Sequence, residues 1–301
     1  MQIANPIYDT VFKYLMSDSK VAKALLSAII GEQIEELNFA PHEYILKKDV
    51  DKSKIDRTLE QITIFRIDFG AKIKTDDGYK TVLIELQKAK LATDIMRFRR
   101  YLGEMYENQE NSYDDKREKA RQIYCIYFLN YEIGLSDSPV IKVDYKVSDM
   151  TTGEVFEKKN EFIESLNHRS WIIQVRQLKA RRRNELENLL SIFDQDNITN
   201  NKHILNIDEN QFPEEYGFIT RKLREAFESK QVREEMHIED EFLNELLNLQ
   251  KSNENLAIEL TKKDEELTKK DEELTKKDEE LTKKDEEIKK LREQLKKYTN
   301  N

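Results

Sequence analysis

The sequence predicts an α/β fold with a mixed central sheet flanked by helices, followed by a long charged C-terminal helix. The first 150 residues alternate between helical and strand-like spacing of apolar side chains, which is typical of α/β proteins. Seven Gly and four Pro in 301 residues are too few for a turn-rich all-β protein. A seven-residue repeat without Gly or Pro near the C-terminus predicts the long helix.

Two helices are expected before the first strand. Asn5 is predicted to cap the first helix, with Pro6 at its first helical position and apolar residues following at helical spacing. A second helical run covers residues 20–30 and is expected to stop at Gly31.

The middle of the chain contains the strands. Strand-like segments lie at residues 44–47, 62–73 and 79–87. A helix at about 93–108 separates them from the apolar strand 122–129, and a further strand candidate covers 140–148. This order predicts a mixed sheet.

The C-terminal half reads as helices that cover a core and lead into a tail. Residues 184–193 and 214–250 have helical spacing, and an asparagine-rich loop is expected at 196–201. We therefore expect a first domain over residues 1–195, a helical extension over 196–250 and a heptad-repeat tail over 251–301.

The tail repeats the unit Glu-Leu-Thr-Lys-Lys-Asp-Glu four times between Glu259 and Glu286. One apolar residue falls in every seven, whereas a standard coiled coil has apolar residues at both the a and d positions. A weak coiled coil that joins copies of the chain and a lone charged helix both remain open.

Composition limits the class of protein. The first 250 residues hold 37 basic and 45 acidic side chains, so any DNA contact must be local or depend on a metal ion.

The lone Cys125 lies in an apolar run and suggests a reducing compartment. The chain opens with no leader-like pattern and holds no apolar stretch of about 18 residues. A cytoplasmic protein without a membrane partner is expected.

The hairpin at residues 61–88 carries the candidate chemistry. If Asp77-Gly78 forms the loop, Asp68 faces Gln87; if the loop is Asp76-Asp77, or the four residues 75–78, Asp68 faces Glu85. In either register Asp68, Glu85 and Gln87 share one face, because side chains alternate along a strand, and Lys88 falls on the other face.

Paired carboxylates in so apolar a setting favour a metal site. Asp68 and Glu85 would repel each other if they were buried together, and a divalent cation relieves that repulsion. Hard carboxylate oxygens suit Mg²⁺, with Mn²⁺ as an alternative. Such an ion polarises a phosphoryl oxygen and generates hydroxide from bound water. Four His and one Cys give no support to a zinc site.

Asp68 followed by Glu85-Leu86-Gln87 resembles the motif of PD-(D/E)XK nucleases, with Gln in the usual Lys position. The wider pattern resembles the Rpn family of recombination-promoting nucleases and putative transposases over roughly residues 1–250. It consists of the segments Asp9-Thr10-Val11-Phe12-Lys13, Arg66-Ile67-Asp68-Phe69, Ile84-Glu85-Leu86-Gln87-Lys88 and Met96-Arg97-Phe98-Arg99-Arg100-Tyr101.

The resemblance implies a restriction-endonuclease-like core and a Mg²⁺-dependent DNA endonuclease that acts in recombination, transposition or defence against foreign DNA. It implies that Asp68 and Glu85 hold the metal and that Gln87 positions the water or phosphate. The competing interpretation is a catalytically inactive, nuclease-like interaction protein that acts through its helical tail.

Several residues have two interpretations. Asp9 either completes the metal site or pairs with Lys13 at i+4, and the ion pair is favoured. Arg97, Arg99 and Arg100 either bind phosphate or form a solvated helix face. The basic run 179–183 either contacts the DNA backbone or only precedes a helix. A structural role is expected for His168 and Trp171.

Overall fold

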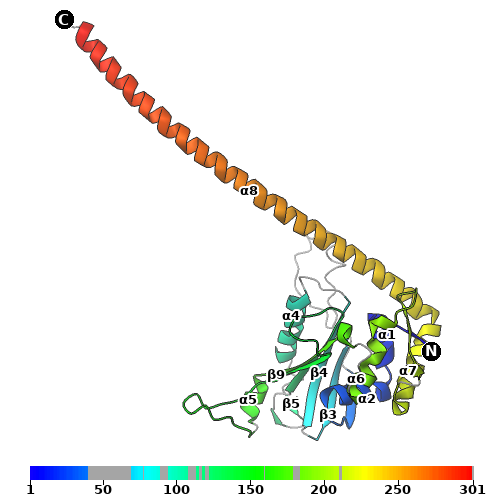
Figure 1. The fold of residues 1–301 in the computed structure, drawn as a ribbon. Helices are drawn as coiled ribbons and strands as arrows, with labels where there is room; N and C mark the ends of the chain where they lie inside the picture. The colour runs from blue at the N-terminus through cyan, green and yellow to red at the C-terminus, as the bar shows by residue number, and fades with distance from the viewer. Residues whose placement is uncertain are drawn as a thin grey trace. The chain divides into compact units, whose positions relative to one another are not determined.

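The protein is described from a computed structural model. The structure describes residues 1–39, 69–76, 78–88, 94–107, 113–114, 117–118, 122–158, 160–178, 184–209 and 212–299. The chain divides into two compact units, Met1–Phe242 and Leu243–Asn301. The first unit contains the sheets and most of the helices (Figure 1).

A mixed sheet forms the centre of the first unit, as the sequence predicts. In the described part of the chain its six strands follow the order β2-β3-β4-β7-β9-β8. Their bounds are β2 (Glu36–Phe39), β3 (Phe69–Thr75), β4 (Gly78–Gln87), β7 (Gln122–Leu129), β8 (Val140–Val143) and β9 (His168–Gln174). Strands β4, β7 and β9 run parallel, whereas β2–β3, β3–β4 and β8–β9 are antiparallel pairs.

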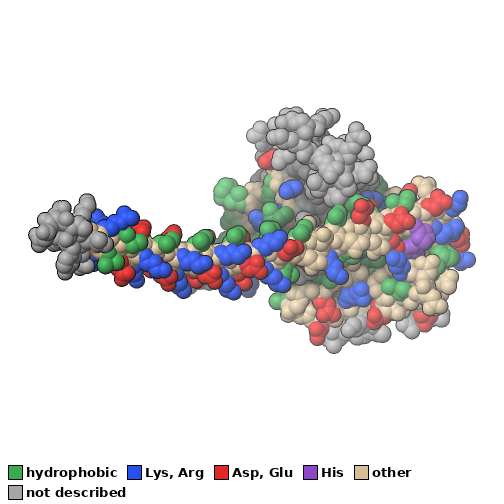
Figure 2. Space-filling view, turned by 90° about the horizontal axis from the view of Figure 1, so that it is seen from above, with side chains coloured by type: hydrophobic (Ala, Val, Ile, Leu, Met, Phe, Trp, Pro, Cys, Tyr) green, Lys and Arg blue, Asp and Glu red, His purple; other side chains and the backbone are tan. Residues whose placement is uncertain are grey.

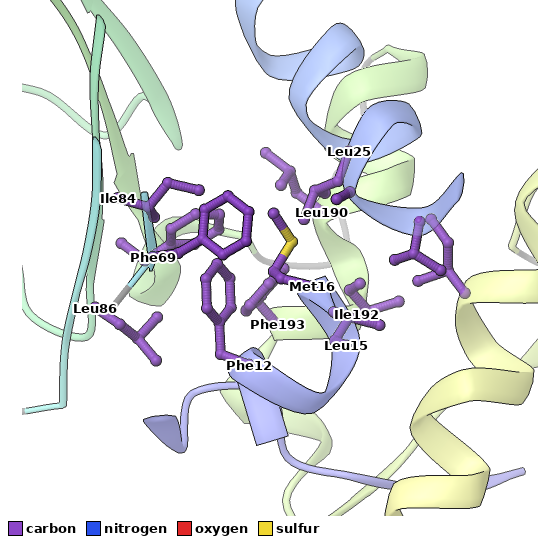
Figure 3. Packing of buried hydrophobic residues seen from close by; sticks show 14 of the residues in the cluster. Phe12, Leu15, Met16, Leu25, Phe69, Ile84, Leu86, Leu190, Ile192 and Phe193 are labelled. Carbon is purple, nitrogen blue, oxygen red and sulfur yellow. The ribbon is translucent and has the colours of Figure 1, made fainter. Parts of the chain in front are cut away.

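One face of this sheet packs against the N-terminal helices and against helices from the second half of the first unit. Helix α1 (Asp9–Met16) packs Phe12 beside Phe128 of the sheet and Phe193, with its ring centroid 5.5 Å and 6.3 Å from theirs. Figure 3 shows this packing beside Ile84 and Leu86 of β4. Helices α2 (Ser19–Ile30), α6 (Glu185–Leu190) and α7 (Gly217–Glu228) contribute to the same core. Burial of these apolar side chains is the main stabilising term.

The opposite face is covered by α4 (Asp94–Glu107), which lies across the sheet from α1 and α2 (Figure 1). Phe98 and Met105 of α4 form a separate apolar cluster with Leu83 of β4 and with Ile123 and Cys125 of β7. We call this surface of the sheet the α4 face and the other the α1 face. Even-numbered residues of β4 from Val82 to Leu86 belong to the α1 face.

Local sequence signals explain where helix α2 begins and ends. The Asp18 side chain accepts hydrogen bonds from the N–H groups of Lys20 and Val21 and so caps its first turn. Gly31 ends it with φ 76°, a left-handed conformation that glycine adopts without steric cost. The predicted span of this helix is confirmed.

The predicted cap of the first helix is wrong. Helix α1 begins at Asp9, and the residue at its N-cap, Tyr8, makes no side-chain capping bond. The Asn5 side chain instead donates to Gln195 Oε1 at 2.9 Å and to the Lys202 carbonyl at 2.9 Å. This long-range pairing holds residue 5 in the turn before the helix, so the local Asn-Pro signal does not start it.

The predicted strands agree with the structure in the centre of the sheet and differ at its edges. The strand over 122–129 is confirmed as β7, and that over 79–87 as β4. Strand β8 ends at Val143, which is earlier than expected, and β2 and β9 were not predicted. The predicted strand 44–47 and the first part of 62–73 lie outside the described residues.

Short elements complete the first unit. They comprise the two-stranded sheet β1 (Gln2–Ala4) with β10 (Ile204–Asn206), the pair β5 (Tyr113–Asp114) with β6 (Arg117–Glu118), helix α5 (Glu161–Ser165), and the 3₁₀ turns η2 (Val175–Gln177), η3 (Ser191–Phe193), η4 (Gln195–Asn197) and η6 (Glu214–Tyr216). The asparagine-rich segment forms turns after η4, close to the predicted loop.

Helix α8 (Lys230–Thr299) confirms the long C-terminal helix. Its first turns contribute Val232 and Met236 to the core of the first unit. Its residues 251–292 are all exposed. No helix in the described ranges is both long and apolar enough to cross a membrane.

Candidate active site on the α4 face of strand β4

Strand β4 presents two buried polar side chains near its carboxyl end. Glu85 has no exposed surface and Gln87 is 6% exposed, although their neighbours along the strand are apolar. Leu83 packs against α4, so the alternation of side chains places Glu85 and Gln87 on the same α4 face. Burying a carboxylate costs free energy unless charge partners or a metal compensate. Glu85 is therefore the strongest chemical signal in the described part of the sheet.

The hairpin between β3 and β4 has one of the two predicted registers. Thr75 pairs with Gly78, so the connection is Asp76-Asp77. Phe69 pairs with Ile84 at the other end of the ladder. Asp68, the second predicted carboxylate, lies outside the described residues.

Strand β7 lies next to β4 and places Tyr127 beside Glu85. Tyr127 pairs with Glu85 in the parallel register, and its ring centroid lies 4.4 Å from that of Phe98 on α4. Burial raises the pKa of Tyr127 far above its ordinary value, and electrostatic interaction with Cys125 and Glu85 adds to the shift. Tyr127 is therefore a neutral phenol at physiological pH.

Gln87 is held by the segment that follows β7. The Tyr131 hydroxyl donates to Gln87 Oε1, and the Asn130 N–H donates to the Gln87 carbonyl at 2.9 Å. The first bond determines which end of the side-chain amide acts as the acceptor. The structure thus orients Gln87 through contacts that its sequence neighbours do not reveal.

Lys88 points to the α1 face, as the alternation predicts. Its Nζ lies 3.0 Å from Asp240 Oδ1 and 3.2 Å from Glu239 Oε1 of α8, and 3.4 Å from the centre of the Tyr8 ring. Lys88 therefore anchors the start of α8 and the turn before α1 to the end of β4.

The arginines of α4 lie on the layer that covers the α4 face. Arg99 and Arg100 are exposed, whereas Phe98, the residue before them, is buried against the sheet. The Arg97 side chain lies outside the described part of the chain. The basic run 179–183 is also outside it.

Asp9 forms the favoured ion pair with Lys13, at 2.5 Å. Its backbone N–H also donates to Glu239 Oε1 at 3.2 Å. These contacts join Asp9 to the cluster around the start of α8, and none of its described contacts reaches Glu85 or Gln87.

A second polar cluster, centred on Asp240, was not predicted. Its carboxylate accepts from Tyr8, Lys88, Lys202 and His203, at distances between 2.6 and 3.1 Å. These donors hold the pKa of Asp240 well below its ordinary value, against the effect of burial. The residues are distant in sequence, so no spacing pattern could have identified them.

The remaining candidates have structural surroundings. His168 Nδ1 lies 3.2 Å from the Tyr106 hydroxyl, and burial lowers the pKa of this histidine. Trp171 is 3% exposed in the core of the α1 face. Among the described side chains, no three His, Cys, Asp or Glu residues gather as a metal site, and Asp68 is not among those side chains.

Comparison with known proteins finds no matching family model, no matching curated protein and no matching solved structure.

Proposed function

We propose that the protein is a metal-dependent DNA endonuclease with a restriction-endonuclease-like core. The observation that carries this proposal is the fully buried Glu85, which shares the α4 face of β4 with Gln87. If the register of the hairpin continued by one residue beyond Phe69 and Ile84, Asp68 would stand directly opposite Glu85. Directly opposed Cβ atoms in an antiparallel pair are about 4.5–5.5 Å apart.

The donor set fits a hard divalent cation. Asp68 and Glu85 would hold Mg²⁺ or Mn²⁺ through carboxylate oxygens. When bound, the ion would polarise the scissile phosphate and lower the pKa of a bound water. The full burial of Glu85 agrees with this role, because a bound cation would relieve the repulsion between two neighbouring carboxylates.

Neighbouring residues supply orientation. The amide of Gln87, whose oxygen is engaged by Tyr131, would donate a hydrogen bond to the attacking water or to a phosphate oxygen. Tyr127 is neutral and lies beside Glu85, so its hydroxyl would be a second hydrogen-bond donor on the α4 face. Neither group adds positive charge, so charge neutralisation must come from the metal and from arginines.

The α4 arginines are the proposed contacts with the DNA backbone. The first 250 residues have an excess of acidic side chains, so non-specific attraction of the whole surface is unfavourable. A local basic face on the helix that covers the site would compensate. Arg99 and Arg100 are exposed there.

Nicking of supercoiled plasmid with Mg²⁺ tests the proposal. We expect Asp68→Asn and Glu85→Gln each to lower the nicking rate by at least about 100-fold, because each removes a metal ligand. Gln87→Lys should retain activity, whereas Gln87→Leu should lose it. Glu154→Gln, which removes an exposed carboxylate from the same unit, is the matched control.

Thermal unfolding of each variant must show that it is folded. Equal Mg²⁺-dependent rates in the wild type and both carboxylate variants would reject the assignment. No activity in any folded form, at any metal concentration, would favour the non-catalytic interaction protein.

A further inference from the structure

The second unit exposes a row of large apolar side chains along one side of α8. Leu260, Leu267, Leu274 and Leu281 are 57–62% exposed, and Ile288 is 47% exposed. Figure 2 shows hydrophobic side chains following one edge of the tail, beside rows of basic and acidic ones. A row of this kind on a soluble helix marks a surface for association.

The apolar row continues beyond the exact repeats in a single heptad phase. With Leu260 at position a, the d positions before it fall on Phe242, Leu249 and Leu256, and Leu291 occupies d after the last repeat. These four side chains are 42–58% exposed. We call the line of a and d positions along α8 the seam. At its two ends the seam has apolar residues at both a and d, as a coiled coil requires.

The exact repeats complement themselves in this phase. Each contains Leu at a, Lys at d, Asp at e and Glu at g, as in Leu260, Lys263, Asp264 and Glu266. In a parallel pair of helices, a d side chain packs beside residue e of the second copy. Each Lys would then reach an Asp of the other helix, while its methylene stem covers the Leu layers.

The threonine hydroxyls of the repeat are bonded within the helix and face away from the Leu row. The hydroxyls of Thr268, Thr275 and Thr282 each donate to the carbonyl four residues earlier, at 2.8 Å. In the single helix Lys263 of the Leu side pairs with Glu259 at 3.2 Å, but the leucines themselves stay exposed.

Register cannot come from the exact repeats alone. Sliding one helix by seven residues replaces each Leu and Lys of the central repeats with an identical residue. The ends break this degeneracy, because Asn253 at an a position pairs well only with the Asn253 of a second copy in parallel register. Asn at a and Lys at d also favour two strands, since a wider bundle would bury the Lys charge.

We propose that α8 joins a second copy of this chain as a parallel, in-register, two-stranded coiled coil that starts at Phe242. The docking surface consists of the a and d positions through Leu291. Asn253 and the apolar ends set the register, and the repeats supply length. Loss or gain of a whole seven-residue unit preserves the seam, so repeat number can change without loss of pairing.

Sedimentation equilibrium of the full chain tests the association. The wild type should be a dimer at micromolar concentration. Leu267→Lys, Leu274→Lys and Leu281→Lys together should shift it to a monomer. Thr268→Lys, Thr275→Lys and Thr282→Lys together add the same charge at adjacent outward positions and should leave it dimeric. A monomeric wild type, or equal behaviour of the two triple variants, would overturn the proposal.

Cysteine cross-linking tests direction and register. Leu256→Cys should form a disulfide-linked dimer under mild oxidation, because d residues of parallel partners lie within disulfide reach. Glu265→Cys, at the outward f position, should not. The native Cys125 is fully buried, so it gives little background. An antiparallel or shifted pair would leave Leu256→Cys uncross-linked and would contradict the proposed register.

Discussion

The Asp240 carboxylate illustrates how single residues hold the first unit together. It collects donors from the turn before α1, the residue that follows β4, and the loop before β10. Glu239 beside it has the opposite tendency, because burial raises the pKa of that carboxyl. At the carboxyl end of β4, Glu85 and Gln87 point to the α4 face, whereas Lys88 points to the α1 face and binds Glu239 and Asp240 of α8.

Asp240→Asn should change how stability depends on pH. Because the folded-state pKa of Asp240 is depressed, its contribution is fully present above the unfolded value near 4 and is lost as pH falls below it. We expect the variant to lose roughly 1–3 kcal/mol at pH 7, where donors are left poorly matched. Between about pH 5 and 3 it should lose less stability than the wild type.

Urea unfolding across this pH range measures the effect. Glu239 contributes with the opposite sign, but it is present in both proteins, so the difference between the two curves reports Asp240. Parallel curves for wild type and variant would show that Asp240 is not the titrating group. Glu154→Gln serves as the exposed-carboxylate control.

The β3–β4 hairpin is the element on which the site depends. Its register determines which residues share a face with Glu85, and the Asp-Asp-Gly sequence limited that register to a few alternatives. The choice between them needed the structure, because Gly78 with φ 104° lies on the strand and pairs with Thr75. Local sequence predicts the turn but not its registration.

Two glycine substitutions test the conformation of this element. Neither Gly78 nor Gly103 has a heavy atom within 4 Å of an added Cβ, so backbone conformation alone should decide the outcome. Gly78→Ala should lower the free energy of unfolding by about 1–3 kcal/mol, because φ is positive there. Gly103→Ala, inside α4, should raise it by about 0.5–1 kcal/mol.

Urea unfolding at neutral pH measures both changes. If Gly78→Ala proved as stable as the wild type, residue 78 would not hold the left-handed conformation and the hairpin register would need revision. The Gly103→Ala protein controls for the general effect of replacing glycine.

For the whole molecule, the sequence predicts the elements with continuous apolar patterns and misses those whose polar residues are satisfied by distant partners. Strand β7 was predicted to the residue, since its run is almost wholly apolar. Strand β9 was missed because polar residues occupy its first three positions, 168–170, and its last position, Gln174. That side chain is buried and bonded to Ile133, Ser136 and Ser138 from a remote loop.

The candidate site was predictable in the same partial way. Alternation along β4 correctly separated Gln87 from Lys88. The orientation of Gln87 by Tyr131, the closeness of Tyr127 to Glu85 and the Asp240 cluster all arise from tertiary contacts. The pairing of Asp68 with Glu85 remains a prediction.

Binding of Mn²⁺ to the full chain tests the central claim most directly. Calorimetric titration of the wild type should show a site whose affinity falls at least tenfold in Glu85→Gln and in Asp68→Asn, since each removes one charged ligand. Glu154→Gln should bind as the wild type does. Equal Mn²⁺ affinity in all four folded proteins would contradict a metal site on the α4 face of β4.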